Sequence, residues 1–227
     1  RSRTPRTSIS GTVTDSLTGD PVAGALVQVA GFGDQFSDVT DADGEFQIGG
    51  LYEGTYRKVA VSGAGYLPEA EEVDTRTTDD IEVELVRDWA ASSGGAEIAD
   101  FTGPDFTPYG CGPAQAIDTS LTTGWGSTTG DDDGTPTNEF EPKYVVIDMN
   151  TAVDIDTFGI DPSATCGDGG SASTGDYRIE TSPDGTSWTE AAAGTFTVDD
   201  RGRVNTVTPT AGSTGVRFVR FTMLSNQ

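Results

Sequence analysis

The sequence predicts an all-β protein made of two β-sandwich domains. Its 227 residues exceed the length of one small sandwich, and a globular domain commonly has about 100 to 200 residues. The chain contains 30 Gly and 11 Pro together with many Thr and Val, a composition typical of short strands joined by turns. Short segments of alternating apolar and polar residues occur in both halves. No run of Ala, Leu, Glu and Lys occurs at the spacing of a helix. We therefore expect almost no helix and a separate core in each half.

The first half contains about seven short strand-like segments. Residues 8–14 alternate Ile9 and Val13 with hydroxyl residues, and residues 81–85 alternate apolar and charged side chains. Asp43 and Gly44 form a turn signal before the segment around Phe46. Further strands are expected at residues 25–30 and 55–61. Seven strands in residues 7–87 predict a small sandwich.

The second half predicts a larger sandwich. Strands are expected at residues 143–149, 155–160, 177–181, 194–198 and 216–224, with a hairpin over 182–190. Residues 99–142 are mostly loop, and so long a loop in a compact domain is normally functional or held in place. We predict a basic N-terminal extension (1–6), a first domain (7–87), a short linker (88–95) and a second domain (96–227).

Charge excludes two kinds of partner. The net charge is -24, with 13 Lys and Arg against 37 Asp and Glu, and both halves are acidic. Nucleic acids and anionic membranes are bound through Lys and Arg, so neither is expected as a partner. No stretch approaches 18 apolar residues, so membrane insertion is not expected either.

The chain has no histidine. Zinc peptidases of the HExxH type, Ser-His-Asp hydrolases and Cys-His proteases all need imidazole as a ligand or base, and these classes are excluded from this segment. A pair of carboxylates across a cleft could still hydrolyse glycosides, but no such pair is marked in the sequence. We therefore expect no catalytic residues here.

Cys111 and Cys166 are the only two cysteines, and each lies in a Gly-rich loop context. This placement favours a disulfide between two loops and a secreted protein. Two free thiols, or pairing with cysteines outside this segment, are the alternatives. The basic start at Arg1 indicates a fragment of a longer precursor whose targeting signal lies upstream.

Residues 7–87 resemble the carboxypeptidase regulatory-like domain. The resemblance is carried by SGTVTDSLTGDPVAGALVQV, TDADGEFQIGGLYEGTY and VSGAGY. It implies a seven-strand transthyretin-like (Ig-like) sandwich that serves as an accessory domain in secreted proteins.

Most of residues 91–227 resemble the discoidin, or coagulation-factor C-type, domain. The resemblance is carried by AQAIDTSLTTGW, KYVVIDMNTAVDIDTFGI, YRIETSPDGTSW and VRFVRFTML. It implies a galactose-binding-like jelly roll, a fold that includes many carbohydrate-binding modules. The family normally ends with a further strand carrying a Glu, whereas this chain ends at Gln227, so we expect the last strand to be missing.

The resemblance implies a calcium site in the loop before Trp125. Its ligands would be the Ala116 carbonyl, the Asp118 carboxylate, Ser120 and both oxygens of Thr123. Such a set of oxygen ligands suits calcium rather than zinc. The alternative is a loop held without an ion by hydrogen bonds from the backbone to Asp118.

Aromatic and polar residues in the loops are candidates for ligand contact. We expect Phe106, Tyr109, Asp131, Asp132, Asp133 and Asn138 to contribute, although a solvated loop is the favoured interpretation of the three adjacent Asp. Trp125 and Trp188 could stack on a sugar ring, but both match family positions where core packing is the favoured role.

The order of the two modules is similar to the C-terminal part of secreted fungalysin-type metallopeptidases and related exoenzymes. This resemblance implies an accessory region that binds extracellular polysaccharide or cell-surface glycan and positions an upstream catalytic domain of the same precursor. The alternative is a structural spacer that self-associates and binds no glycan.

Overall fold

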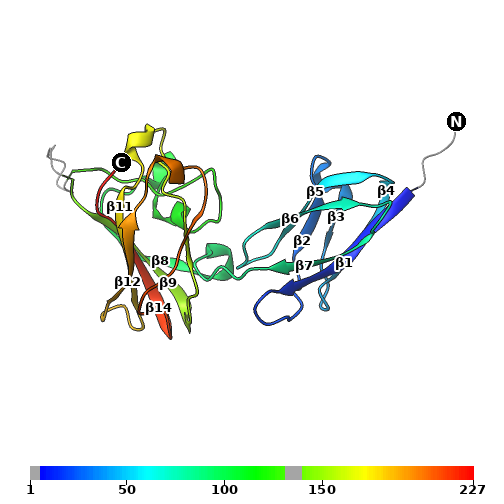
Figure 1. Cartoon of the computed structure of the whole chain (residues 1–227), viewed down its shortest axis with the longest axis horizontal. Helices are drawn as coiled ribbons and strands as arrows, with labels where there is room; N and C mark the ends of the chain where they lie inside the picture. The colour runs from blue at the N-terminus through cyan, green and yellow to red at the C-terminus, as the bar shows by residue number, and fades with distance from the viewer. Residues whose placement is uncertain (1–5, 131–139) are drawn as a thin grey trace. The chain divides into compact units, whose positions relative to one another are not determined.

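The computed structural model describes residues 6–130 and 140–227. Across these residues the chain is built from β-strands, turns and short 3-10 helices, without an α-helix, which confirms the all-β prediction (Figure 1). The chain divides into two compact units, Arg1–Trp89 and Ala90–Gln227, and each is described by itself. None of the helices in the described ranges is long and apolar enough to cross a bilayer.

The first unit is a seven-stranded sandwich of two sheets. One sheet has the order β4-β1-β7, in which β1 runs antiparallel to β4 and parallel to β7. The other has the order β3-β2-β5-β6 and is antiparallel throughout. The strands are β1 (Arg6–Asp15), β2 (Leu26–Val29), β3 (Ser37–Val39), β4 (Glu45–Tyr52), β5 (Thr55–Ser62), β6 (Glu69–Asp74) and β7 (Asp80–Leu85).

Alternating side chains fill the core between these two sheets. Ile9 and Val13 of β1 and Val83 and Leu85 of β7 are buried, whereas Ser10, Thr12 and Glu84 are more exposed. The β2 and β5 strands contribute valines at the same period of two, because successive strand residues point to opposite faces. The alternation read from the sequence therefore places the core of this unit correctly.

The Asp43-Gly44 segment forms the predicted turn before β4. Gly44 has a φ of +74°, a left-handed conformation that favours glycine. The Asp41 carboxylate accepts the backbone N–H groups of Asp43 and Glu45, both at 3.0 Å. These bonds hold the turn through the side chain of a single residue.

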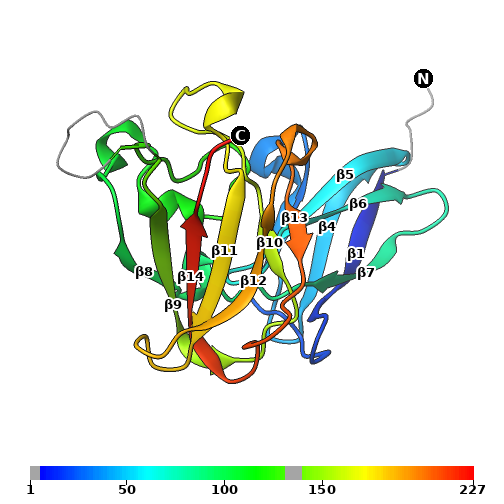
Figure 2. The ribbon, with the colours of Figure 1, turned by 60° about the vertical axis from the view of Figure 1, so that its left-hand side comes forward.

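The second unit has a five-stranded antiparallel sheet with the order β12-β11-β14-β9-β8 and a separate two-stranded sheet, β10-β13 (Figure 2). The strands are β8 (Glu97–Phe101), β9 (Lys143–Val153), β10 (Phe158–Ile160), β11 (Asp176–Ser182), β12 (Thr189–Thr195), β13 (Asn205–Val207) and β14 (Val216–Met223). Tyr177 stacks on Phe196, with the ring centroids 4.3 Å apart.

Several strand expectations for the second unit are wrong in detail. The strand β12 ends at Thr195, within the segment predicted at residues 194–198, and the 3-10 helix η6 (Val198–Asp200) follows it. Thr197 and Asp200 form a reciprocal capping box that stops strand pairing. Strands β8 and β13 were not predicted, and β10 begins at Phe158 instead of at residue 155.

The stretch between the predicted domains has structure of its own. Residues Ser92–Gly94 form the short 3-10 helix η2. The backbone N–H of Ser92 donates to the carbonyl of Ile117 at 2.9 Å. These residues are thus anchored in the second unit.

Candidate functional site

A disulfide between Cys111 and Cys166 joins two loops of the second unit. The Cα atoms are 5.8 Å apart and the cysteines are separated by 55 residues. Cys111 is only 2% exposed, and its carbonyl accepts the N–H of Gly126 at 3.0 Å. The predicted disulfide is confirmed, and it ties the long loop after β8 to the loop that precedes β11.

Residues 105–112, here called the aromatic turn, form a compact structure in the long loop. Asp105 Oδ1 accepts the backbone N–H of Thr107 at 2.8 Å and its hydroxyl at 2.6 Å. These two hydrogen bonds lower the pKa of Asp105 below its usual value. The Phe106 carbonyl accepts the N–H of Tyr109 at 2.9 Å and that of Cys111 at 3.3 Å. The turn is therefore held by its own hydrogen bonds as well as by the disulfide.

Close packing adds to the rigidity of the aromatic turn. A Cβ atom at Gly112 would lie 2.1 Å from Thr107 Oγ1 and 2.8 Å from the Thr107 backbone nitrogen, so glycine is required. The 3-10 helix η3 (Thr107–Tyr109) begins with Pro108 in its first turn and ends at Gly110, which has a φ of +78°. Pro108 fixes the local backbone dihedral and Gly110 permits the left-handed ending.

The aromatic turn presents one highly exposed aromatic ring. Tyr109 is 80% exposed, whereas Phe106 is partly buried. The two rings meet edge to face, with centroids 6.1 Å apart and an interplanar angle of 72°. The backbone beneath Tyr109 is already fixed. A ligand can therefore bind its exposed ring face without the entropic cost of ordering a loop.

The loop predicted to hold calcium brings two of its expected ligands together. Asp118 Oδ1 accepts the N–H of Ser120 at 2.9 Å, and Asp118 Oδ2 accepts the hydroxyl of Thr123 at 2.6 Å. The Ser120 hydroxyl instead lies 3.0 Å from that of Thr122. Ala116 ends the 3-10 helix η4 (Pro113–Ala116) just before the loop. Asp118 and Thr123 fit an oxygen-ligand site, and Ser120 fits it less well.

Asp118 is the only carboxylate that the loop 117–127 contributes. Over the described ranges, no group of three or more His, Cys, Asp or Glu side chains could hold a metal ion. Any cation at this loop would depend on backbone carbonyls and hydroxyls around one carboxylate. Such a donor set suits calcium held weakly.

Both tryptophans of the second unit lie outside the aromatic turn. Trp188 is partly buried, and the Arg220 guanidinium lies over its ring at 4.3 Å from the centroid. Arg220 Nε also donates to Glu180 Oε2 at 2.8 Å. Trp125 is partly buried and its indole Nε1 is enclosed, with no hydrogen-bond partner among the described residues.

Four of the residues expected to contact a ligand, Asp131, Asp132, Asp133 and Asn138, lie outside the described residues. The supporting residues Asp105, Thr107 and Gly112 were not singled out from the sequence. An Asp two residues before a Thr is a common way to satisfy the first N–H groups of a turn. That spacing, followed by Pro-Tyr-Gly, is the signal that could have found the aromatic turn.

The described residues form two compact β-sandwich units. The model of the carboxypeptidase regulatory-like domain matches residues 8–86, and that of the F5/8 type C domain matches residues 97–227. The second match covers more than half of the chain, which therefore belongs to the F5/8 type C domain family. A carboxypeptidase regulatory-like domain precedes this domain.

A search of curated proteins found no match. Among solved structures, one similar protein is CpGH89CBM32-5 from Clostridium perfringens, in complex with GalNAc-β-1,3-galactose. It has 18% identity and a TM-score of 0.46, and the match covers 59% of this chain and 86% of that chain. Another is the C-terminal domain of a chitobiase from Bacteroides fragilis, with 22% identity, a TM-score of 0.44, and coverage of 58% and 85%.

Proposed function

We propose that this chain is a non-catalytic, glycan-binding accessory region and that Tyr109 is its principal ligand contact. The observation that carries the proposal is the 80% exposed ring of Tyr109 on a turn fixed by hydrogen bonds and a disulfide. Membership of the F5/8 type C family supports it, because the resemblance to this family implies a carbohydrate-binding fold.

Stacking on a sugar explains why an exposed ring would be held so firmly. The apolar face of a pyranose ring packs against an aromatic face, and burial of both surfaces favours association. A rigid platform loses less conformational entropy on binding than a mobile loop does. The aromatic turn meets both conditions, since its backbone is bonded internally and Tyr109 extends from it.

Glycan arrays followed by calorimetry on the bound glycans test the proposal. Tyr109→Ala should weaken binding at least tenfold, about 1.4 kcal/mol, whereas Tyr109→Phe should retain most of the affinity. Tyr52→Ala is the matched control, since Tyr52 is an exposed tyrosine of the first unit. Binding to no glycan, or equal binding by wild type and Tyr109→Ala, would contradict the proposal.

The proposal extends to location and context. A disulfide supports action outside the cell, because disulfides persist in oxidising compartments. We propose that an enzyme precedes this region in the same precursor. This region would hold that enzyme against the surface of its substrate. A metallopeptidase is the enzyme that the order of the two modules favours.

Calcium is a separate part of the proposal. The convergence of Asp118 Oδ2 and the Thr123 hydroxyl supports an ion held weakly in the loop before Trp125. If bound there, it would supply structural order to the loop. The aromatic turn has its own bonds and would bind glycan without direct contact to that ion.

A further inference from the structure

We propose that Thr107 is the positioning residue of the Tyr109 ring, because its hydroxyl group joins the first and last residues of the aromatic turn. This inference rests on the proposed function and deepens it by naming the residue that determines how well the ring is ordered before a ligand binds. Thr107 would act through the backbone of the turn, without contact to the glycan.

The Thr107 hydroxyl contacts both ends of the aromatic turn. It donates to Asp105 Oδ1, at the start of the turn, at 2.6 Å. A Cβ atom at Gly112, at the end of the turn, would lie only 2.1 Å from Thr107 Oγ1, so the hydroxyl packs directly on the Gly112 backbone. One oxygen atom therefore holds the two ends of this segment in place.

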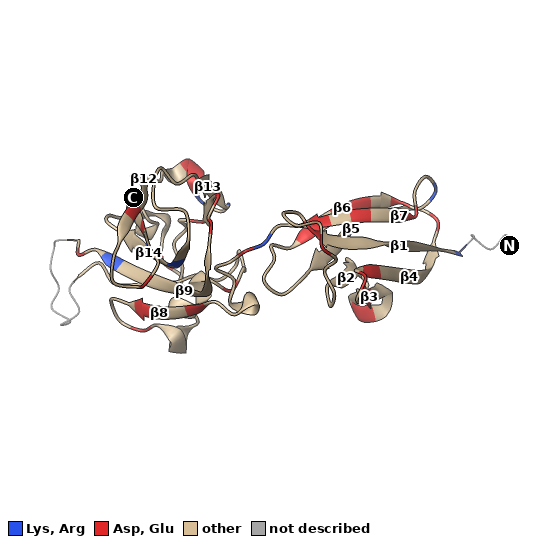
Figure 3. Cartoon of the chain, turned by 90° about the horizontal axis from the view of Figure 1, so that it is seen from below, with Lys and Arg blue, Asp and Glu red and all other residues tan. Residues whose placement is uncertain are grey.

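The Asp105 carboxylate is held by Thr107. Its Oδ1 atom also accepts the Thr107 backbone N–H at 2.8 Å. The hydroxyl bond is the largest cause of the lowered pKa of Asp105, and the backbone bond is the next. Residues 102–130 contain neither Lys nor Arg, and Figure 3 shows how sparse these residues are across the chain. The carboxylate thus serves as an anchor for Thr107, without a cation from its own loop.

The backbone connects this anchor to Tyr109. Thr107 is the first residue of the 3-10 helix η3, and Tyr109 is the last. The Phe106 carbonyl accepts the N–H of Tyr109 at 2.9 Å, and the Thr107 carbonyl accepts that of Gly110 at 3.0 Å. Because a single 3-10 turn has few internal bonds of poor geometry, its order depends on the residue that fixes its start.

The effect of the Thr107 hydroxyl should be local. Asp105 and Thr107 are both exposed, so water can replace their hydrogen bond at little cost to the stability of the whole unit. Tyr109 would nevertheless become mobile, and a ligand would then have to order the ring as it binds. That entropic cost should weaken binding by roughly fivefold.

The variants Thr107→Val and Thr107→Ser test this role. Valine keeps the β-branched shape and removes the hydroxyl, whereas serine keeps the hydroxyl. The first measurement is the NMR order parameter of the Tyr109 backbone amide in the full chain without glycan. Wild type and Thr107→Ser should give about 0.85, the value of a rigid backbone, and Thr107→Val a value nearer to about 0.6.

The second measurement is calorimetric affinity for the oligosaccharide that binds most tightly on the glycan array. Thr107→Val should bind it roughly fivefold more weakly, and Thr107→Ser should bind it as wild type does. Thr55→Val is the matched control, because the Thr55 hydroxyl donates to the Asp74 carboxylate at 3.3 Å in the first unit. This control should change neither the order of Tyr109 nor the affinity.

The order parameter and the affinity together decide the inference. An unchanged order parameter in Thr107→Val would overturn it, and a lower affinity in that case would show that Thr107 touches the glycan. Lower order with wild-type affinity would also overturn it. The proposed function would stand in each of these cases as long as Tyr109→Ala loses binding. A silent glycan array would instead remove the proposed function and, with it, the role of Thr107 in binding.

Discussion

The guanidinium of Arg87 lies over the ring of Tyr66, 4.3 Å from its centroid, and donates a 2.6 Å hydrogen bond to the Tyr66 hydroxyl. Both residues contact the carboxylate of Asp15, at the end of β1. Asp15 is only 4% exposed. Asp15 Oδ2 accepts the Tyr66 hydroxyl at 2.8 Å and Arg87 at 3.1 Å. A buried acid is thereby satisfied by two segments that lie 51 and 72 residues away.

Tyr66→Phe should destabilise the first unit by about 1 to 3 kcal/mol, because it removes a donor from a buried carboxylate. Calorimetry that resolves the transition of this unit measures the effect. Tyr52→Phe is the control, since Tyr52 is exposed and should change the midpoint little. Equal midpoints for the two variants would show that the Asp15 hydrogen bond contributes nothing.

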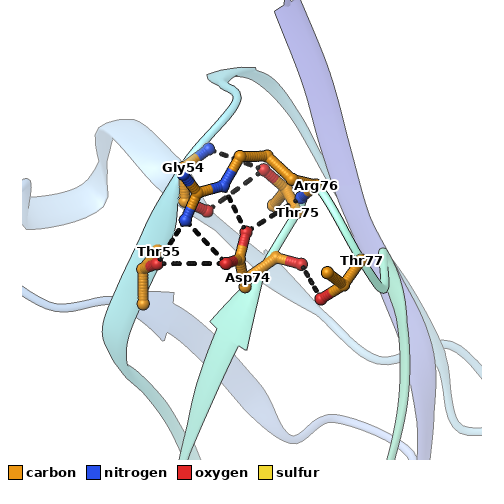
Figure 4. A network of polar contacts seen from close by, with 6 residues as sticks. All are labelled: Gly54, Thr55, Asp74, Thr75, Arg76 and Thr77. Atoms are coloured by element: carbon orange, nitrogen blue, oxygen red, sulfur yellow. Dashed lines mark hydrogen bonds and ion pairs between the residues drawn. The ribbon is translucent and has the colours of Figure 1, made fainter.

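Acid should weaken the first unit between about pH 4 and pH 2. Hydrogen bonds and an ion pair from Arg76 lower the pKa of Asp74 from 3.8 to about 2 (Figure 4). Hydrogen bonds from Tyr66 and from the backbone also lower the pKa of Asp15, against the opposing effect of its burial. A carboxylate with a lowered folded pKa stabilises the fold above its unfolded pKa, and this stability is lost as the pH falls through the folded value.

Asp74→Asn is the variant that tests this pH dependence. Urea unfolding at pH 5 and at pH 2.5 should show a smaller loss of stability for the variant than for wild type, because the amide does not titrate. Glu72→Gln, an exposed change in the same strand, should lose as much stability between pH 5 and pH 2.5 as wild type does. An equal loss in Asp74→Asn would show that the pair of Asp74 and Arg76 does not cause the acid sensitivity.

The alternation of apolar and polar residues made it possible to predict the fold of the first unit from the sequence. Strands such as β7 bury every second residue, so the period of two gave both strand and core. The ends of the strands in the second unit were harder to predict from the sequence. The capping box of Thr197 and Asp200 is a local hydrogen-bond pattern that competes with strand pairing, and apolar periodicity does not detect it.

The candidate site could be predicted as residue types but not as a geometry. The disulfide between Cys111 and Cys166 was predicted correctly because cysteines in Gly-rich loops have a recognisable context, and Tyr109 was named as an aromatic residue in a loop. The support beneath Tyr109 depends on Thr107 packing against Gly112 and on the disulfide to a loop far along the chain. Contacts of this kind follow from folding in three dimensions, and neighbouring residues alone do not indicate them.

Removal of the disulfide should destabilise the second unit by about 4 kcal/mol on the chain-entropy model for a loop of this length. The double variant Cys111→Ser, Cys166→Ser gives this value by comparison with wild type under oxidising conditions. Reductant should lower the wild-type midpoint and leave the double variant unchanged. A double variant as stable as wild type would show that the covalent link adds nothing to the noncovalent contacts of the two loops.

Calcium should raise the melting temperature of the second unit at about millimolar concentration, as expected for a weak extracellular site. Magnesium should have less effect, because it requires a smaller and more regular ligand shell. Asp118→Asn should abolish the response, and Asp168→Asn should retain it. Identical melting with EDTA and with excess calcium would indicate that Asp118 holds the loop through its hydrogen bonds alone.

Trp188→Ala should lower the stability of the second unit by about 2 kcal/mol while glycan affinity changes less than twofold. The Trp188 ring lies against Arg220, and Arg220 is bonded to Glu180, so the substitution loosens a packed surface on the five-stranded sheet. Tyr109→Ala should have the opposite pattern, since its exposed ring contributes little to the core. Thermal unfolding and calorimetric titration of both variants separate the two roles. If Trp188→Ala instead abolished binding with an unchanged midpoint, the sugar platform would lie on the sheet and the assignment to the aromatic turn would be wrong.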